Sequence, residues 1–552
     1  MKNKIISLIA IASIVFGGIG CQEPEDLTPS ISRAGINGIT ASFYGDESSE
    51  NAFTSEVDSI NGIITVVFPY NYPRMSNNVL TMADLTKMRV TANLDDNVTI
   101  SPTILYMDFT NANYITVTDQ TKKKKGYEVV AEIRKSAECA ITNFELTSLG
   151  LSGVIDEVNK TISLISVDPI GSALATVTVS HGAIMSPDPT TTALNYSNDL
   201  QITVTAQNET NSAVYTVKKA VPSKTDFGMR SGSAKILWVK KLNTDLGITT
   251  LNMTGGMAVT KGYVVLNTRG LNSIYLDRKT GEKIGEIDLG TNKGSLINFY
   301  NTCDDNDNIL FCNLAPNAGS FKVWRINGVA ATPELYIEWN GGLAIGRKLS
   351  IKGSLDGNAI ITAPINAAGY QFARWQVIGG SLQSQTPTLV TITGFTTNWN
   401  YNCDIVYTDP TNLNSDYFVS CYSAPYKFSW VDGITNTVKA AGAVISSNWV
   451  QNATDYTVFN NCPYAASNSV NSFTWGGDDK IYLYDVSSSS GFSSTVWDAP
   501  ISTYGGKDNG GANGNGTGDV ALKVSDDGYY MYLYFMFTNG CVVCVQYDCI
   551  DM

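Results

Sequence analysis

The stretch "GMAVTKGYVVLNTRGLNSIYLDRKTGEKIGEIDLG", residues 256–290, contains four short, largely apolar runs separated by polar turns. Runs of this length, bounded by glycine, asparagine and aspartate, predict β-strands joined by tight turns. Four consecutive strands of this kind form the repeating unit, or blade, of a β-propeller. The stretch therefore predicts the first blade of a propeller.

Later stretches repeat this unit. Trp324, Trp375 and Trp430 each mark the third strand of a unit and recur roughly every 50 residues, a period typical of propellers. Before each tryptophan, the second strand ends in Ala-Pro, as in "ILFCNLAP" at 309–316. The last unit supplies only three strands, and the lone strand at 234–242 can complete it and close the ring. We expect residues 234–552 to form a six-bladed propeller, with seven blades as the alternative.

Two earlier segments, 34–135 and 136–220, look like copies of one module. Both contain short alternating strands in the same order, and both close with "ITVT", a turn and a Tyr-x-Val strand. Strands at this spacing predict Ig-like β-sandwiches. The expected fold class is therefore all-β, with two Ig-like modules followed by the propeller.

The N-terminus has the features of a secretory signal over residues 1–20. Lys2 and Lys4 precede an apolar run at 5–16, which is too short to span a bilayer, and small residues follow. Cleavage before Cys21 would make that cysteine the first residue of the mature chain. The alternative is an ordinary cleaved signal followed by an incidental cysteine.

This N-terminus resembles a bacterial lipoprotein signal, and the acidic stretch "QEPED" at 22–26 resembles the export tag of surface lipoproteins in Bacteroidota. The paired modules resemble the tandem Ig-like domains of surface lipoproteins from Bacteroidota polysaccharide-uptake systems. The resemblance implies acylation of Cys21, a lipid-anchored linker at 21–33, and an outer-membrane location facing the cell exterior. The partners that it implies are outer-membrane lipid, a glycan or polysaccharide, and an outer-membrane glycan transporter.

Composition argues against several classes of function. The 552-residue chain has a net charge of −13, which disfavours nucleic acid as a partner. Its one histidine, His181, leaves little basis for a Ser-His-Asp triad or a histidine-rich metal site. Cys541, Cys544 and Cys549 have a metal-like spacing, but a strand would place Cys541 and Cys544 on opposite faces. We expect buried free thiols there, no metal and no cofactor.

The candidate binding site lies where the fourth strand of one blade connects to the first strand of the next. Two such connections contain the motif Asn-Trp-x-x-Asn, and a third contains "NFYN" at 298–301. These connections and the loops after Ala-Pro should meet on one face, beside the central channel. The candidate ligand-binding residues are Trp399, Trp449, Asn398, Asn402, Asn448, Asn452, Phe299, Tyr300, Tyr370 and Tyr422.

Aromatic and amide side chains suit a sugar, because a ring can stack on the C–H face while amides meet the hydroxyls. The alternative is that Asn-Trp-x-x-Asn is a structural turn. Asp404 and Asp455, near the start of two first strands, are weak candidates for a catalytic pair. We expect a non-catalytic glycan-binding surface protein; the alternatives are a propeller glycosidase or lyase, and a protein-interaction or adhesion module.

Overall fold

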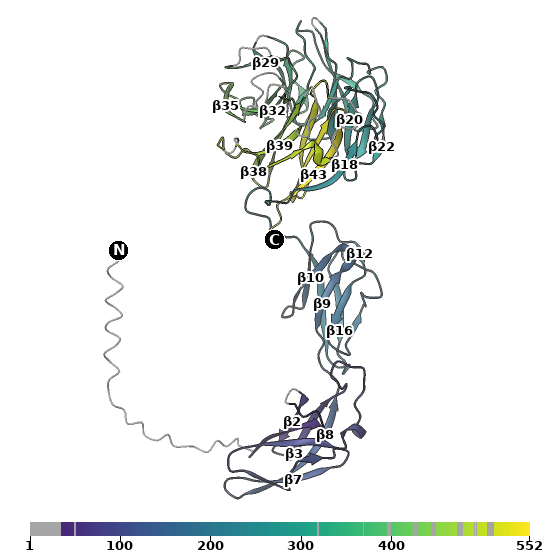
Figure 1. Ribbon diagram of the computed structural model, residues 1–552, viewed down its shortest axis with the longest axis vertical. Helices are drawn as coiled ribbons and strands as arrows, with labels where there is room; N and C mark the ends of the chain where they lie inside the picture. Colours follow the sequence, from purple (N-terminus) through teal and green to yellow (C-terminus); the bar gives the residue numbers. More distant parts are fainter. Residues whose placement is uncertain are drawn as a thin grey trace, which may run out of the picture. The chain divides into compact units, whose positions relative to one another are not determined.

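A computed structural model describes residues 35–48, 51–316, 319–367, 369–394, 399–422, 428–442, 449–471, 479–490, 492, 494–504 and 513–551. The chain divides into two compact units, Met1–Val221 and Pro222–Met552 (Figure 1). Both are built from strands, which confirms the all-β class. Within the described ranges, no helix is long and apolar enough to cross a membrane.

The first unit contains two large sheets with separate hydrophobic cores. The strands of the first are β1 Ile36–Phe43, β2 Phe53–Asp58, β3 Ile63–Pro69, β4 Met88–Leu94, β5 Thr99–Ser101, β6 Tyr106–Met107, β7 Asn113–Thr118 and β8 Lys124–Arg134, with the short helix η2 Met82–Leu85 between β3 and β4. The second has β9 Ile141–Leu146, β10 Leu151–Asp156, β11 Thr161–Ile165, β13 Thr176–Val179, β14 Ile184–Ser186, β16 Leu200–Thr205 and β17 Ser212–Ala220, with the helix η3 Thr147–Leu149 and a separate pair, β12 Ser172–Ala173 and β15 Leu194–Asn195.

The two large sheets share one order of strand pairing. In each, the third strand pairs in parallel with the last, as β3 with β8 and β11 with β17. The last strand also pairs antiparallel with the strand before it, as β7 with β8 and β16 with β17. The shared order supports the repeat seen in the sequence, while the Ig-like assignment stays a prediction.

The second unit is a six-bladed propeller, as predicted. Blade 1 is β19 Thr254–Val259, β20 Tyr263–Thr268, β21 Ser273–Asp277 and β22 Lys283–Ile287; blade 2 is β23 Tyr300–Cys303, β24 Asn308–Cys312, β25 Phe321–Asn327 and β26 Glu334–Trp339; blade 3 is β27 Ser350–Gly353, β28 Ala359–Ile365, β29 Tyr370–Ile378, β30 Ser381–Leu382 and β31 Thr388–Ile392. Blade 4 is β32 Cys403–Tyr407, β33 Tyr417–Cys421, β34 Phe428–Asp432 and β35 Thr437–Ala441; blade 5 is β36 Trp449–Val450, β37 Thr454–Phe459, β38 Cys462–Asn471, β39 Lys480–Asp485 and β40 Trp497–Pro500, followed by the helix η5 Ile501–Tyr504.

Blade 6 closes the ring with a strand from the start of the unit. Its strands are β41 Gly518–Val524, β42 Tyr530–Phe537, β43 Cys541–Asp548 and β18 Lys235–Lys241. β18 pairs antiparallel with β43, from Lys235 opposite Gln546 to Lys241 opposite Cys541. The predicted closure is confirmed, and the edge of β43 is covered rather than open.

The segment before β18 also belongs to this unit, beyond the expected boundary at residue 234. The amide of Thr225 donates to Cys549 O at 2.7 Å, and the amide of Arg230 donates to Asp548 O at 2.7 Å. The Arg230 guanidinium forms a two-pronged ion pair with Asp548, with Nε–Oδ1 at 2.8 Å and Nη2–Oδ2 at 2.7 Å. Residues 222–233 are therefore attached to the last strand of the propeller.

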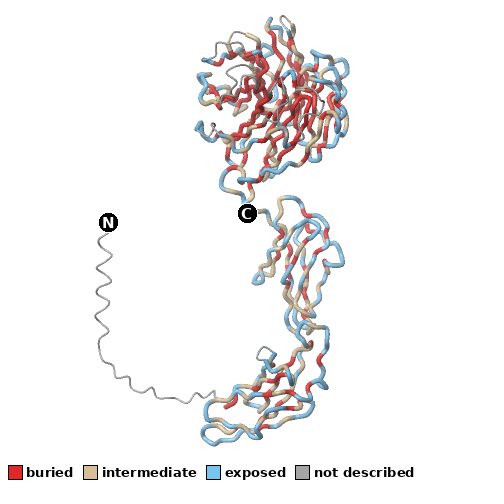
Figure 2. The backbone as a smooth tube through the Cα atoms, in the orientation of Figure 1, coloured by how far each residue is buried: buried red, intermediate tan, exposed pale blue. Residues whose placement is uncertain are grey.

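Burial in the propeller follows the position of each strand in its blade (Figure 2). Every residue of β24, β28, β32 and β33 is buried, whereas the fourth strands β22 and β35 are mostly exposed or half-buried. Trp324, Trp375 and Trp430 lie in the third strands β25, β29 and β34, as their spacing predicts. The tryptophan period therefore marks blade packing.

Cys541, Cys544 and Cys549 are buried, as predicted, and none of them forms a disulfide with another described residue. Cys541 and Cys544 pack in different hydrophobic clusters, on opposite faces of β43. Burial raises the pKa of the Cys544 thiol to about 12. His181 lies in the first unit, where its Nε2 is 2.9 Å from Ser76 O.

Candidate functional site

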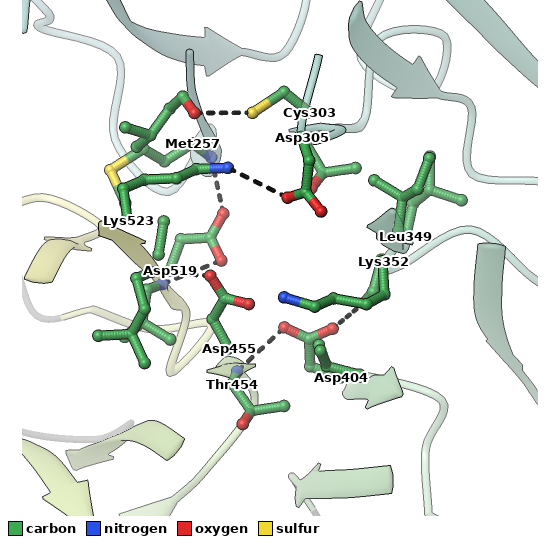
Figure 3. Close-up of a pocket in the computed structure, with 18 of the residues that line it drawn as sticks. Met257, Cys303, Asp305, Leu349, Lys352, Asp404, Thr454, Asp455, Asp519 and Lys523 are labelled. Carbon is green, nitrogen blue, oxygen red and sulfur yellow. Dashed lines mark hydrogen bonds and ion pairs between the residues drawn. The ribbon is translucent and has the colours of Figure 1, made fainter. Parts of the chain in front are cut away.

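The innermost strands of the six blades surround a central channel, defined here as the space lined by β19, β23, β27, β32, β37 and β41. Three carboxylates enter it from equivalent positions, because Asp404, Asp455 and Asp519 are each the second residue of an inner strand (Figure 3). Lys352 and Lys523 also line the channel.

Each of these carboxylates accepts a backbone N–H from the inner strand of the next blade. Asp404 Oδ2 accepts from Thr454 N at 3.0 Å, and Asp455 Oδ2 accepts from Leu522 N at 2.7 Å. Asp519 Oδ2 accepts from Met257 N at 2.7 Å, across the junction between the last blade and the first. The aspartates therefore join neighbouring blades at the axis of the ring.

Further bonds occupy the remaining lone pairs. Ser350 Oγ donates to Asp404 Oδ1, and Tyr300 OH lies 2.8 Å from both oxygens of Asp519. Lys348, which is 1% exposed, places its Nζ 3.5 Å from Asp519 Oδ1 and donates to Gly518 O at 2.9 Å. Buried charges are stable only when they are paired and hydrogen-bonded, and these groups meet that condition.

Burial changes the acidity of these groups. It raises the pKa of Asp404 to about 7, against the opposing effect of the Lys348 charge. Burial also raises the pKa of Asp455 and of Asp519, and Lys348 again opposes the shift at Asp519. A perturbed pKa in a cleft can mark a catalytic group, but buried structural networks produce the same shift.

The channel leaves little room for a substrate. Its free volume is about 40 Å³, where a single water needs roughly 10–15 Å³. Glycoside hydrolysis requires two carboxyl groups on either side of a bound sugar. Asp404 is 3% exposed and has both oxygens engaged, so the geometry of the channel favours a structural role for it.

A second hollow of about 200 Å³ opens where the inner strands begin. We call it the mouth pocket; its lining residues are Gly255, Arg269, Leu296, Phe299, Tyr300, Leu314, Arg347, Lys348, Asn402, Asn515 and Thr517. They come from the starts of inner strands, from the connections that precede these strands, and from loops that follow second strands. These two sets of loops do meet on one face, as the sequence predicts. A wider hollow of about 340 Å³, which includes Ile248 and Leu271, contains none of the predicted site residues.

The polar side chains of the mouth pocket differ in how far they are engaged. The Arg269 guanidinium lies 4.4 Å from the Phe299 ring centroid and donates to Asn252 O. Arg347 lies 5.0 Å from the ring centroid of Tyr401. Asn402 is 3% exposed, and its side-chain amide makes no hydrogen bond with any residue in the described ranges.

Three of the predicted ligand-binding residues, Phe299, Tyr300 and Asn402, line the mouth pocket. Phe299 is half-buried, whereas the Tyr300 ring is buried and its hydroxyl is bound to Asp519. Of the three predicted residues that line the pocket, Phe299 and Asn402 have side chains that remain available to a ligand.

The sugar-stacking role predicted for Trp399 is wrong, because its side chain is fully buried. Its Nε1 donates to Ile365 O at 3.0 Å, and its ring stacks on Tyr370 with centroids 4.8 Å apart. Tyr370, another predicted ligand-binding residue, is likewise fully buried. The pair fills the core between blades 3 and 4, since an indole can satisfy its one donor on a neighbouring carbonyl.

Asn452 is also structural, contrary to the prediction. Its Nδ2 donates to Gly516 O at 2.8 Å, and its Oδ1 accepts from Asn468 at 2.8 Å. Tyr422 is half-buried and packs against two of the hydrophobic clusters. For Asn452, the structural-turn alternative is the better account of the motif.

Other predicted residues lie outside the part of the chain that the structure describes. These are Cys21, with the signal and linker segments, and Asn398 and Asn448; Trp449 lies in β36, but its side chain is outside the described set. Nothing in the geometry bears on the roles predicted for them.

The sequence interpretation missed Arg269, Arg347 and Lys348. Arg269 directly follows the second strand of blade 1, and "GRKL" at 346–349 directly precedes the inner strand of blade 3. Both places belong to the two kinds of loop, before an inner strand or after a second strand, that were predicted to form the site and that include Phe299 and Asn402. A sugar site predicted from aromatic and amide side chains does not include cations, so these three residues are absent from the prediction. Asp519 was missed too, although "GDV" repeats the position of Asp404 and Asp455.

The chain is similar to solved structures and to family models of known proteins. No curated protein matches the chain. The crystal structure of a DUF4623 family protein from Bacteroides eggerthii DSM 20697 is similar over 75% of this chain and 99% of that chain, with 16% identity and a TM-score of 0.44. The WD40 β-propeller domain of Doa1 is similar over 57% of this chain and 97% of that one, with 10% identity and a TM-score of 0.32.

Three family models match in succession. Residues 16–131 match Domain of unknown function (DUF5018), and residues 141–219 match Domain of unknown function (DUF8499). Residues 237–548, more than half of the chain, match Domain of unknown function (DUF8500). The chain belongs to the family described as Domain of unknown function (DUF8500).

Proposed function

We propose that the propeller is a non-catalytic binding module and that its mouth pocket takes a glycan. The observation that carries the proposal is the Asn402 amide, buried in the wall of an open pocket with no described hydrogen-bond partner. An unused amide offers both a donor and an acceptor, which suits neighbouring hydroxyls of a sugar. Phe299, Leu296 and Leu314 supply apolar surface beside it.

The enzyme alternative is less well supported. Its candidate carboxylates, Asp404 and Asp455, hold backbone amides of neighbouring blades. The channel between them has space for only a few waters. A protein-interaction module is the other alternative, and the propeller fold is compatible with it, because fold alone does not fix the ligand.

The proposal extends to location. Acylation of Cys21 would anchor the chain in the outer membrane, and the acidic stretch at 22–26 would direct it to the outer face. The two N-terminal modules would then act as spacers. An outer-membrane glycan transporter is the partner proposed to receive the bound polysaccharide.

The test is calorimetric titration of the purified full chain with neutral and acidic oligosaccharides. We expect binding without release of new reducing ends. Asn402→Ala should weaken binding by about 0.5–1.5 kcal/mol, the usual net value of one hydrogen bond. The proposal fails if no oligosaccharide binds and a protein partner is captured instead. It also fails if reducing ends accumulate.

A further inference from the structure

We infer that the mouth pocket selects a glycan that carries a carboxylate, as uronic acids do, and that Arg347 binds this carboxylate. The inference rests on the proposed function, since it names the chemical class of the ligand for the same pocket. Three observations carry it: the free guanidinium of Arg347, the uncompensated positive charge of the pocket, and the neighbouring amide of Asn402.

The Arg347 guanidinium makes no hydrogen bond that involves a described residue. Its Nε is buried without a hydrogen-bond partner, and the side chain has no ion pair with any carboxylate in the described part of the chain. Its contact with the Tyr401 ring orients the planar group without using its N–H donors. Buried donors are nearly always satisfied in folded proteins, so an orphaned Nε at a pocket wall points to a missing acceptor.

The described residues that line the pocket do not neutralise its positive charge. Lys348 is paired with Asp519, but none of the described lining residues is acidic, and Arg269 is held by backbone carbonyls rather than by a carboxylate. Burial and the nearby charge of Arg347 lower the pKa of the Arg269 guanidinium. Two adjacent guanidiniums therefore repel each other until an anion joins them.

A carboxylate on a sugar ring fits this set of groups. Guanidinium and carboxylate form two parallel hydrogen bonds, a geometry that hydroxyls match poorly. Asn402 can bond the adjacent hydroxyl, and Leu296, Leu314 and Phe299 can cover the ring. The chain as a whole carries −13, so the attraction of an acidic ligand would come from the guanidiniums of the pocket at short range.

The test compares oligogalacturonate with its fully methyl-esterified form, in which the same sugars carry no charge. Calorimetric titration of the full chain should show at least tenfold tighter binding of the free acid. Arg347→Gln should weaken binding of the free acid at least tenfold and binding of the ester much less, so that the preference for the acid is lost. Lys261→Gln is the matched control: it removes one positive charge from the exposed turn between β19 and β20, at the opposite end of the blade, and should change neither affinity.

A second variant tests the inference independently, in case Arg347→Gln does not fold. Asn402→Asp places a negative charge beside the proposed carboxylate site, and it should weaken binding of the free acid more than binding of the ester. Thermal unfolding of every variant checks the fold.

The outcomes separate the two claims. Equal binding of acid and ester, or full binding of the acid by Arg347→Gln, would overturn the carboxylate inference while the proposed function stands. Binding of sulfated oligosaccharides in place of uronates would also overturn it. Failure of every acidic and neutral oligosaccharide to bind the native chain would overturn the proposed function itself.

Discussion

At the residue scale, Trp399 and Asn402 lie three positions apart in one connection and have opposite surroundings. Trp399 is fully buried and stacked on Tyr370, whereas Asn402 faces an open pocket. We expect Trp399→Ala to cost about 3–5 kcal/mol of unfolding free energy, as truncation of a core aromatic does. Asn402→Ala should cost less than about 1 kcal/mol, because it breaks no described hydrogen bond. Urea unfolding of both variants checks this; a native-like midpoint for Trp399→Ala would contradict it.

Asp404 should make stability depend on pH. The unfolded chain releases this proton near the usual value of 3.8, while the folded chain holds it to about pH 7. Between these values the folded state binds more protons, so this group's stabilisation is lost as pH rises through the window. The loss amounts to roughly 4 kcal/mol. Asp404→Asn removes the ionisation, and its amide can still accept from Thr454 N.

Unfolding free energies of wild type and Asp404→Asn, measured from pH 4.5 to 7.5, check this dependence. The unfolding free energy of Asp404→Asn should increase relative to that of the wild type as pH rises. Asp356→Asn is the control, because hydrogen bonds from Asn308 and Asn306, together with Arg325, lower the pKa of Asp356 to about 2, outside the window. Parallel curves for wild type and Asp404→Asn would show that Asp404 is ionised in the fold throughout.

At the scale of elements, the closing strand β18 depends on the segment before it. A fragment that begins at Pro222 keeps β18 and the Arg230–Asp548 ion pair. A fragment that begins at Asn243 loses both and exposes the edge of β43. We expect the first fragment to fold and the second to aggregate or unfold, as judged by circular dichroism and thermal melting. Equal melting temperatures would rule out a stabilising role for closure.

Arg230 itself can be tested in the full chain. Arg230→Ala leaves Asp548, a mostly buried carboxylate, without its partner. The expected loss is about 1.5–3 kcal/mol, the range for hydrogen bonds to charged groups. Lys322→Ala, which breaks an exposed pair with Glu338 in the same propeller, should cost less than about 1 kcal/mol. Chemical unfolding followed by tryptophan fluorescence reports on the propeller, where every tryptophan lies.

The elements could be predicted from the sequence better than the site could. Third-strand tryptophans repeat because each blade buries the same position, and this regularity is visible in one sequence. Trp399 looked like a ligand platform because nothing local shows that its indole faces Tyr370 and Ile365 rather than solvent. Arg347 could not be predicted as a site residue, because the sequence does not show whether a guanidinium has hydrogen-bond partners in the fold.

At the scale of the whole molecule, the proposed acylation of Cys21 would hold the chain at a membrane. If it is acylated, Cys21→Ala should abolish palmitate labelling and move the protein from the membrane fraction to the soluble fraction, because a lipid anchor is the only hold that the N-terminal sequence predicts. Fractionation and metabolic labelling of cells that express each form check this. A variant that still labels and sediments with membranes would disprove the anchor.

Ring closure by β18 also has a mechanical consequence. Any tension along the chain between the N-terminal modules and the propeller enters through residues 222–230 and reaches β18. The ion pair between Arg230 and Asp548 of the last strand precedes the first β18–β43 backbone pair along the chain, so it bears part of the force first. The load is thus shared between the beginning and the end of the ring instead of peeling one strand away. Under a pulling force, this junction would keep β18 paired with β43 and so keep the ring closed.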